Sequence, residues 1–461
     1  MAIPRTIGAL LVVLATPSCF PSFDLDDAGA GGTGGSVVTA SGGGGSTSEG
    51  TSTTVGGGGT GGEGGSGGGG ITCTPGVQPW RVIVGEVSDT VPVASTDNHI
   101  QSIVMSGGTA FVGGYTEKAI ASASLDDHSF FIAELDYLEG QPTPVYRSSS
   151  ISTGSGPSIV LSKADTDTGL WVALGADESV YFYELNQNTV DLGTSPTLTC
   201  TGASRPSIAA SDSTGYLAIQ VGDVQASCDT DVPCVIQPNG SRSTFMIPLP
   251  IADDNGCENG ISYAIDEQYA SINAIALDAA GLHATSIGGA TGNVHQQIRY
   301  EGSDWTVPVA VGGTNSSLPT FVTPLVTTSD SYVAGTTMVG AHPDTFVKRW
   351  DGAIVYENTA NPPATALMRA AATSQDTFLL GGMQNETPPS AWVMRVGRLD
   401  TFNYSSFDVS AVVTAVAMDE CGNGVIAGVY HGTDLELGPL TTPGSTAGPT
   451  AFIQFIPFDA Q

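Results

Sequence analysis

Short apolar runs recur along the chain in pairs, and a tight polar turn separates the two members of each pair. The clearest pair is AVAMDECGNGVIAGVYHG at residues 415–432, where apolar and small residues flank a turn containing Asp and Gly. Apolar positions that alternate with a period of two on both sides of such a turn predict a β-hairpin. Seven segments share this pattern: residues 102–116, 158–177, 207–223, 274–292, 321–337, 366–383 and 415–432.

A further apolar run follows each predicted hairpin and gives it a third strand. These runs are residues 129–136, 180–186, 243–250, 293–300, 344–351, 391–400 and 451–459, and fourth runs lie at residues 144–150, 305–311 and 353–359. One small antiparallel sheet cannot cover both of its faces, but sheets packed face to face around a ring cover one another. We therefore predict an all-β fold, a β-propeller with seven four-stranded blades. Six or eight blades remain alternatives, because residues 102–116 lack the Asp turn and residues 366–383 lack its Gly.

Residues 80–87, WRVIVGEV, precede the first hairpin and belong to no repeat, while residues 451–459 have no fourth run after them. An open ring would leave strand edges exposed. We therefore predict that the N-terminal strand pairs with the last repeat, completes its blade and closes the ring.

The repeats resemble a known sequence family. A D-x-x-G-N turn between two apolar strands, followed by a strand that begins with Thr or Asp before Ala-Phe, resembles the bacterial seven-bladed propeller repeat labelled SBBP. The best match is the last repeat, with Asp419, Gly422, Asn423, Gly428, Thr450, Ala451, Phe452, Ile453 and Asp459; the next is Asp344, Thr345, Phe346, Val347, Lys348 and Asp351. The resemblance covers about residues 75–461 and implies the fold and an exported or surface protein. Its motifs are turn and strand positions, so it implies little about chemistry.

The N-terminus indicates export. Arg5 is followed by an apolar run and by small residues before Cys19, which is typical of a secretory signal and too short for a permanent membrane helix. The cysteine at the end of this run resembles the lipidated cysteine of bacterial lipoproteins, and plain secretion is the alternative. We expect a signal peptide at residues 1–19, a disordered linker rich in Gly, Ser and Thr at residues 20–72, and the propeller at residues 73–461. The expected location is the cell envelope or outer surface, or else the medium.

The chain is strongly acidic. It has 13 Lys and Arg against 45 Asp and Glu, a net charge of −32. Nucleic acid and anionic lipid would repel such a chain, so both are poor partners, and membrane contact is expected only through the lipid anchor. We expect a monomer that binds an unidentified extracellular glycan or protein.

Six cysteines follow Cys19, namely Cys73, Cys200, Cys228, Cys234, Cys257 and Cys421. An even number in an exported chain predicts disulfides, with 15 pairings possible. The short loop between Cys228 and Cys234 makes this pair the first candidate, and Cys73 with Cys421 is the second. Zinc normally requires two closely spaced pairs, which this sequence lacks, so we expect no metal and no cofactor.

The sequence offers little for catalysis. Asp126–Asp127 and Asp253–Asp254 are adjacent acids in loops, which are usually solvated, and no credible nucleophile accompanies them. Binding residues are expected in the connections between second and third strands, which lie at one end of every blade: residues 116–128, 222–243, 335–344, 383–390 and 430–450. The predicted function is a non-enzymatic binding or surface-scaffold module, and an extracellular carbohydrate- or peptide-active enzyme is the alternative.

Overall fold

The computed structural model describes residues 77–458 with gaps. Residues outside the description are 1–76, 85–86, 89–90, 93–97, 121–123, 139, 141, 165–168, 212–213, 223–224, 230–233, 237–242, 252–259, 264–270, 279–280, 289–293, 302–303, 307–308, 312–321, 328–329, 340–341, 358–365, 375–376, 385–387, 398–401, 407–408, 433, 445–448 and 459–461. Within the described part, no helix is long and apolar enough to cross a membrane.

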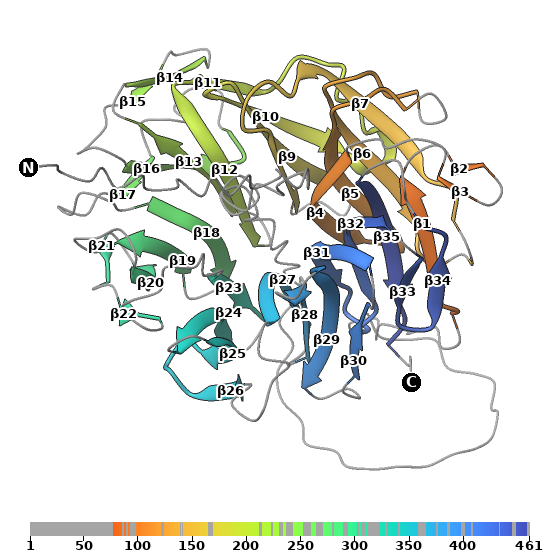
Figure 1. Cartoon of the computed structure of the whole chain (residues 1–461). Coiled ribbons are helices and arrows are strands. Elements are labelled where there is room, and N and C mark those ends of the chain that lie inside the picture. The colour runs from red at the N-terminus through yellow and green to blue at the C-terminus, as the bar shows by residue number, and fades with distance from the viewer. Residues whose placement is uncertain are drawn as a thin grey trace, which may run out of the picture.

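The strands form seven antiparallel sheets arranged as the blades of a β-propeller (Figure 1). Blade I contains β4 (Asn98–Ser106), β5 (Thr109–Thr116), β6 (Ser129–Asp136) and β7 (Val145–Ser152). Blade II contains β8 (Ser158–Lys163), β9 (Gly169–Ala176), β10 (Ser179–Asn186) and β11 (Leu198–Thr201). Blade III contains β12 (Ala203–Ser211), β13 (Thr214–Val221), β16 (Ser243–Leu249) and β17 (Ile261–Tyr263).

The remaining blades repeat this order. Blade IV contains β18 (Ser271–Asp278), β19 (Gly281–Gly288), β20 (Val294–Glu301) and a fourth strand broken into β21 (Asp304–Trp305) and β22 (Val309–Ala310). Blade V contains β23 (Val322–Val326), β24 (Ser331–Val339), β25 (His342–Arg349) and β26 (Ile354–Glu357). Blade VI contains β27 (Ala366–Ser374), β28 (Thr377–Gln384), β29 (Ser390–Gly397) and β30 (Phe402–Ser405). The seven predicted hairpins are confirmed as the first two strands of the seven blades.

Blade VII is closed by the N-terminal strand, as the sequence predicted. It contains β31 (Val409–Met418), β32 (Gly424–Gly432) and β35 (Thr450–Ile456), and β1 (Trp80–Val84) pairs antiparallel with β35. The Trp80 ring stacks on Phe455 with centroids 5.7 Å apart, and its Nε1 donates to the Tyr137 carbonyl of blade I at 3.3 Å. The first strand of blade VII also packs against β4, so strands from the two ends of the chain meet at this seam.

The core lies between the blades. One apolar cluster joins blade VII to blade I, and others join II to III and VI to VII. The first strands of successive blades contact each other all the way round and form an inner ring (Figure 1). Successive side chains of a strand point to opposite faces of the sheet, so they pack against the preceding blade and the following blade in turn. This explains the period of two in the sequence.

Several second strands need a glycine near their end, because the backbone of the first strand approaches closely there. In blades I, VI and VII, the first strand carries a β-bulge opposite Gly114, Gly382 and Gly428. A Cβ at any of these glycines would collide with a carbonyl oxygen of the first strand. Only glycine allows the two backbones to pack at this position.

Two hairpins are inserted between second and third strands. In blade III, β14 (Ala226–Asp229) and β15 (Cys234–Ile236) leave their own blade and pair with β11, so the sheet of blade II has six strands. In blade VII, β33 (Leu435–Leu437) and β34 (Leu440–Thr442) pair with each other and contact β30 and β1. A two-stranded sheet of β2 (Val87–Ser88) and β3 (Val91–Pro92) follows β1.

Candidate functional site on the loop face

The antiparallel order of the strands places two kinds of connection at one end of every blade. These are the connections between second and third strands and those leading into the next blade; we call this end of the ring the loop face. The turns between first and second strands and between third and fourth strands lie at the opposite face. Function in such scaffolds is carried mostly by loops held on a rigid frame, so the loop face is the first place to look for a site.

The expected binding loops differ in kind. Residues 222–243 and 430–450 contain the inserted hairpins β14–β15 and β33–β34, so both are partly ordered strands rather than open loops. The prediction of a loop at residues 335–344 is wrong for most of this range, because β24 continues to Val339 and β25 begins at His342. In residues 116–128, Ile120 and Leu125 form an isolated β-bridge that narrows the loop.

Among the described residues, non-glycine residues with positive φ occur on the loop face and not on the opposite face, although glycines with positive φ occur on both. Among the described residues, five non-glycine side chains have positive φ: Ser124 (52°), His128 (51°), Asp177 (48°), Glu178 (58°) and Arg205 (48°). All five belong to loop-face connections or strand starts of blades I, II and III. On the opposite face, the described residues with positive φ are all glycine: Gly107, Gly108, Gly281, Gly352, Gly397 and Gly422.

The strained loops are tied together across the blade boundaries. The Thr153 N–H donates to the His128 carbonyl at 2.9 Å, which attaches the connection between blades I and II to the blade I loop. The Ser155 N–H and hydroxyl both donate to Asp177 Oδ1, at 2.7 and 3.0 Å. The Ala203 N–H of blade III then donates to the Glu178 carbonyl at 3.0 Å. The loop face of blades I to III is therefore one connected surface.

Charge on this surface is mainly negative. Glu117, Asp126 and Asp127 are exposed, as are Asp177 and Glu178. The hydrogen bonds from the backbone N–H and the hydroxyl of the neighbouring serine hold the pKa of Asp177 below its usual value, because they favour the ionised carboxylate. Asp126 and Asp127 are an exposed adjacent pair, and the other adjacent pair, Asp253 and Asp254, lies outside the described residues.

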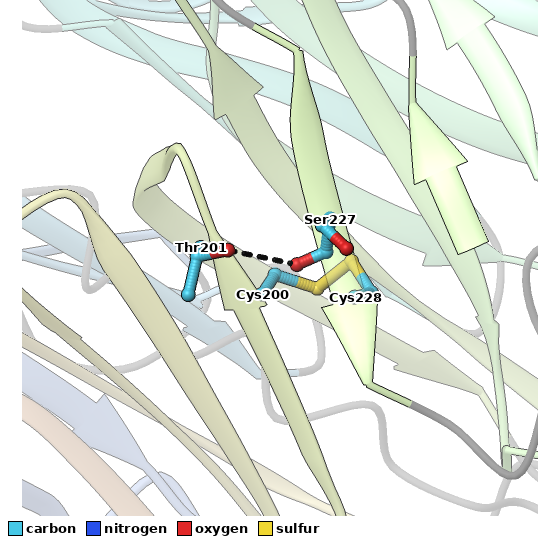
Figure 2. The surroundings of a disulfide bond; sticks show 4 residues. All are labelled: Cys200, Thr201, Ser227 and Cys228. Atoms are coloured by element: carbon cyan, nitrogen blue, oxygen red, sulfur yellow. Dashed lines mark hydrogen bonds between the residues drawn. A yellow bond between two sulfur atoms is a disulfide. The ribbon is translucent and has the colours of Figure 1, made fainter. Parts of the chain in front are cut away.

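The disulfide expected between Cys228 and Cys234 is wrong. Cys228 is bonded to Cys200, and both are fully buried. Figure 2 shows the two cysteines on neighbouring strands, with the Thr201 hydroxyl donating to the Ser227 carbonyl at 3.3 Å. Cys234 is the register partner of Cys228 on the other side of β14. Because β14 lies between β11 and β15, Cys228 has a cysteine opposite it on both sides, and spacing in the sequence reveals just one of them.

The remaining cysteines are only partly described. Cys421 is disulfide-bonded, and its partner is neither Cys200 nor Cys228, which bond to each other. Cys19, Cys73 and Cys257 lie outside the described residues, so the proposed lipidation and the proposed link between Cys73 and Cys421 remain predictions. The disulfide between Cys200 and Cys228 joins blade II to the hairpin inserted from blade III, and so fastens two blades together.

Asp419 has the turn-forming role that the sequence predicted. Its Oδ1 accepts from the Cys421 and Asn423 N–H groups at 2.9 and 2.8 Å, and its Oδ2 accepts from Asn423 Nδ2 at 2.8 Å. A contact that sequence reasoning missed is the Tyr137 hydroxyl of blade I, which donates to the same Oδ2 at 3.0 Å. Burial and the neighbouring carboxylate raise the pKa of Tyr137 strongly, so the phenol stays protonated and keeps the two blades joined.

Sequence reasoning also missed Arg81, the charged residue of the closing strand. Its guanidinium donates to the carbonyls of Leu435 and Leu437, to the Thr442 hydroxyl and, through two of its nitrogens, to Gln454 Oε1. Burial lowers the pKa of Arg81 to about 10. The sequence shows one basic residue in an apolar run but not the inserted hairpin whose carbonyls surround it.

The comparisons with known proteins return distant likenesses to solved structures. No protein-family model matches the chain, and no curated protein matches it. Among solved structures, a mutant Aleuria aurantia lectin in complex with alpha-methyl-L-fucoside is 11% identical with a TM-score of 0.36, covering 65% of this chain and 92% of the lectin. A puromycin-hydrolyzing peptidase of Mycobacterium tuberculosis is 13% identical with a TM-score of 0.43, covering 77% and 53% of the two chains. An acylaminoacyl peptidase is 6% identical with a TM-score of 0.45, covering 76% and 51%. The chain thus spans about half the length of these two peptidases.

Proposed function

We propose that this chain is an exported, non-enzymatic binding or surface-scaffold module, and that its ligand lies against the loop face of blades I to III. The observation that carries the proposal is the distribution of positive φ. A non-glycine residue in the left-handed region costs roughly 1–2 kcal/mol, and Gly would remove that cost at each position. The opposite face has glycine alone in this conformation, whereas the loop face keeps side chains at five positions beside the glycines Gly154, Gly156, Gly202, Gly432 and Gly438. Retained side chains are expected where they have a function.

The rigid frame beneath the loops supports binding rather than catalysis. The groups with raised or lowered pKa values in the described part include Arg81, Tyr137 and Tyr430, and each holds neighbouring segments together. Tyr430, for example, donates to the Pro443 carbonyl at 3.1 Å. Perturbed groups in an active site should instead face a substrate. An extracellular glycan or protein is the proposed ligand class.

Export and anchoring belong to the same proposal. The signal pattern at residues 1–19 and lipidation of Cys19 would place the propeller at a membrane surface, and residues 20–72 would act as its tether. The repeat resembles that of exported surface propellers, which agrees with this placement. Mass spectrometry of the protein from its native host tests the anchor: we expect an acylated N-terminal peptide beginning at Cys19, and an unmodified mature N-terminus would contradict lipidation.

The binding proposal is tested with the purified protein on glycan and peptide arrays. We expect saturable binding to one ligand class, and we expect Glu178→Gly to weaken it without lowering the melting temperature. The matched control is Gly107→Ala on the opposite face, which should lower the melting temperature and leave binding unchanged. If the arrayed ligands are cleaved rather than retained, the chain is an enzyme and the proposal is wrong.

A further inference from the structure

The first strands of the blades share an irregularity near their loop-face ends. The pairing register shifts at this place in β4, β12, β18, β27 and β31. A bulge leaves a residue without a partner in the ladder and turns its side chain in a new direction. The residues at the bulges are Gln101 in blade I, Arg205 and Pro206 in blade III, Asn273 in blade IV, Arg369 in blade VI and Thr414 in blade VII.

In two blades the bulged side chain binds the next blade. Gln101 Nε2 donates to the Pro157 carbonyl at 3.2 Å, and its Oε1 accepts from the Ile159 N–H at 2.8 Å. The Thr414 hydroxyl donates to the Ile100 carbonyl at 2.6 Å. In these two blades the bulged side chain links neighbouring first strands and is satisfied by the protein itself.

Arg369 occupies the same position without such a partner. Its side chain is half-buried, and its Nη2 atom is buried with no hydrogen-bond partner in the described part of the chain. Desolvation lowers the pKa of Arg369 below the usual arginine value. Buried donors are nearly always satisfied, and an unpaired guanidinium is more costly to bury than a neutral donor. An acceptor supplied from outside the chain would satisfy this group.

The charge of the inner ring fits an anion. Although the chain has 45 Asp and Glu against 13 Lys and Arg, Asp278 is the single acid in the seven first strands, and it ends β18 at the face opposite the bulges. Arg205 stands at the bulge of blade III, at the same level as Arg369 and on another side of the ring. First strands that carry no acid at the bulge level, and an arginine there in two of them, favour negative charge near the axis.

We propose that Arg369 anchors a site for the carboxylate group of a ligand at the inner rim of the loop face. The proposal rests on the proposed function and adds to it a second contact on the same face, at blade VI, for a ligand that carries a carboxylate. The planar guanidinium presents paired donors that match the two oxygens of a carboxylate. A polyanion would be repelled by the net charge of −32, whereas one carboxylate balances one arginine. A sugar acid and a peptide C-terminus both supply this group.

Calorimetric titration of the full-length protein tests the site. The probes are D-glucuronate with D-glucose as its uncharged counterpart, and an N-acetylated dipeptide with either a free or an amidated C-terminus. We expect the carboxylate form of one pair to bind at least ~10-fold more tightly than its neutral form, as is typical of a charged hydrogen bond. Binding should also weaken below about pH 4, where the carboxylate becomes protonated. If the charged and neutral forms of both pairs bind with equal affinity, the proposal is wrong.

Substitutions assign the effect to Arg369. Arg369→Gln should weaken carboxylate binding at least ~10-fold and raise the melting temperature of the ligand-free protein, because it removes an unpaired buried cation. Arg369→Lys keeps the charge and should retain part of the affinity. The control is Arg349→Gln, an exposed arginine on the opposite face whose Nη2 lies 2.6 Å from Asp330 Oδ2, and it should bind like the original protein.

The outcomes separate this site from the proposed function. If Arg369→Gln fails to fold or melts earlier, Arg369 is a structural residue and the site is refuted. If arrays show ligand binding that neither depends on a carboxylate nor changes in Arg369→Gln, the binding module stands and the site is refuted. If no arrayed ligand and no carboxylate probe binds, both are refuted.

Discussion

Replacing Trp80 by alanine should nearly unfold the propeller, because this residue attaches the closing strand to both sides of the seam. Trp80 is 4% exposed, stacks on Phe455 and donates through Nε1 to the Tyr137 carbonyl. Truncation of a buried Trp costs about 3–5 kcal/mol, and the lost hydrogen bond leaves the carbonyl unpaired at about 1 kcal/mol more. The expected loss in the free energy of unfolding is therefore about 4–6 kcal/mol, a large share of the roughly 5–15 kcal/mol available to a domain.

Urea unfolding followed by tryptophan fluorescence and circular dichroism measures this loss. Trp80→Phe should keep the stack on Phe455 but not the hydrogen bond, so its cost should fall well below that of the alanine variant. Val145→Ala is the control, because Val145 is 45% exposed on the outer strand of blade I and should change stability by less than about 0.5 kcal/mol. If Trp80→Ala cost less than about 1.5 kcal/mol, β1 would not be needed to close the ring.

Three other measurements test the loop face and the closing seam. Glu178→Gly should raise the free energy of unfolding by about 1 kcal/mol in thermal melts, because Gly adopts the left-handed turn without strain; a decrease would contradict the strain argument. Asp177 has a lowered pKa in the folded state, so its contribution to stability is present above its unfolded value near 4 and is lost as the pH falls through the lower folded value. Asp177→Asn should therefore flatten the dependence of the melting temperature on pH in that acidic window, and an unchanged pH profile would refute the assignment. A non-reducing peptide map should link Cys421, which is disulfide-bonded, to Cys73, upstream of the closing strand; a link from Cys421 to another cysteine would refute the pairing.

The turn at Asp419 shows which contacts can be predicted from the local sequence and which cannot. The spacing of Asp419, Gly422 and Asn423 was enough to predict a turn, because its hydrogen bonds join residues at most four positions apart. The same carboxylate also accepts from Tyr137, which lies 282 residues away in the sequence. No local pattern contains that second contact, so its role at the seam was not predictable.

The sequence alone determined the seven hairpins, their third strands and the closing role of residues 80–87, of which residues 80–84 form the strand. Alternating apolar positions and turn residues act over a few residues, and the closing strand was the one strand left without a repeat. Tertiary structure alone decided which partners distant segments meet. Cys228 bonds to Cys200 because β14 crosses to the neighbouring blade, and Arg81 is buried because an inserted hairpin supplies carbonyls around it. In the sequence, nothing distinguishes Arg369 from other polar residues within strands. Its unsatisfied guanidinium results from a bulge and from the packing of adjacent blades, which are properties of the closed ring and not of any single repeat.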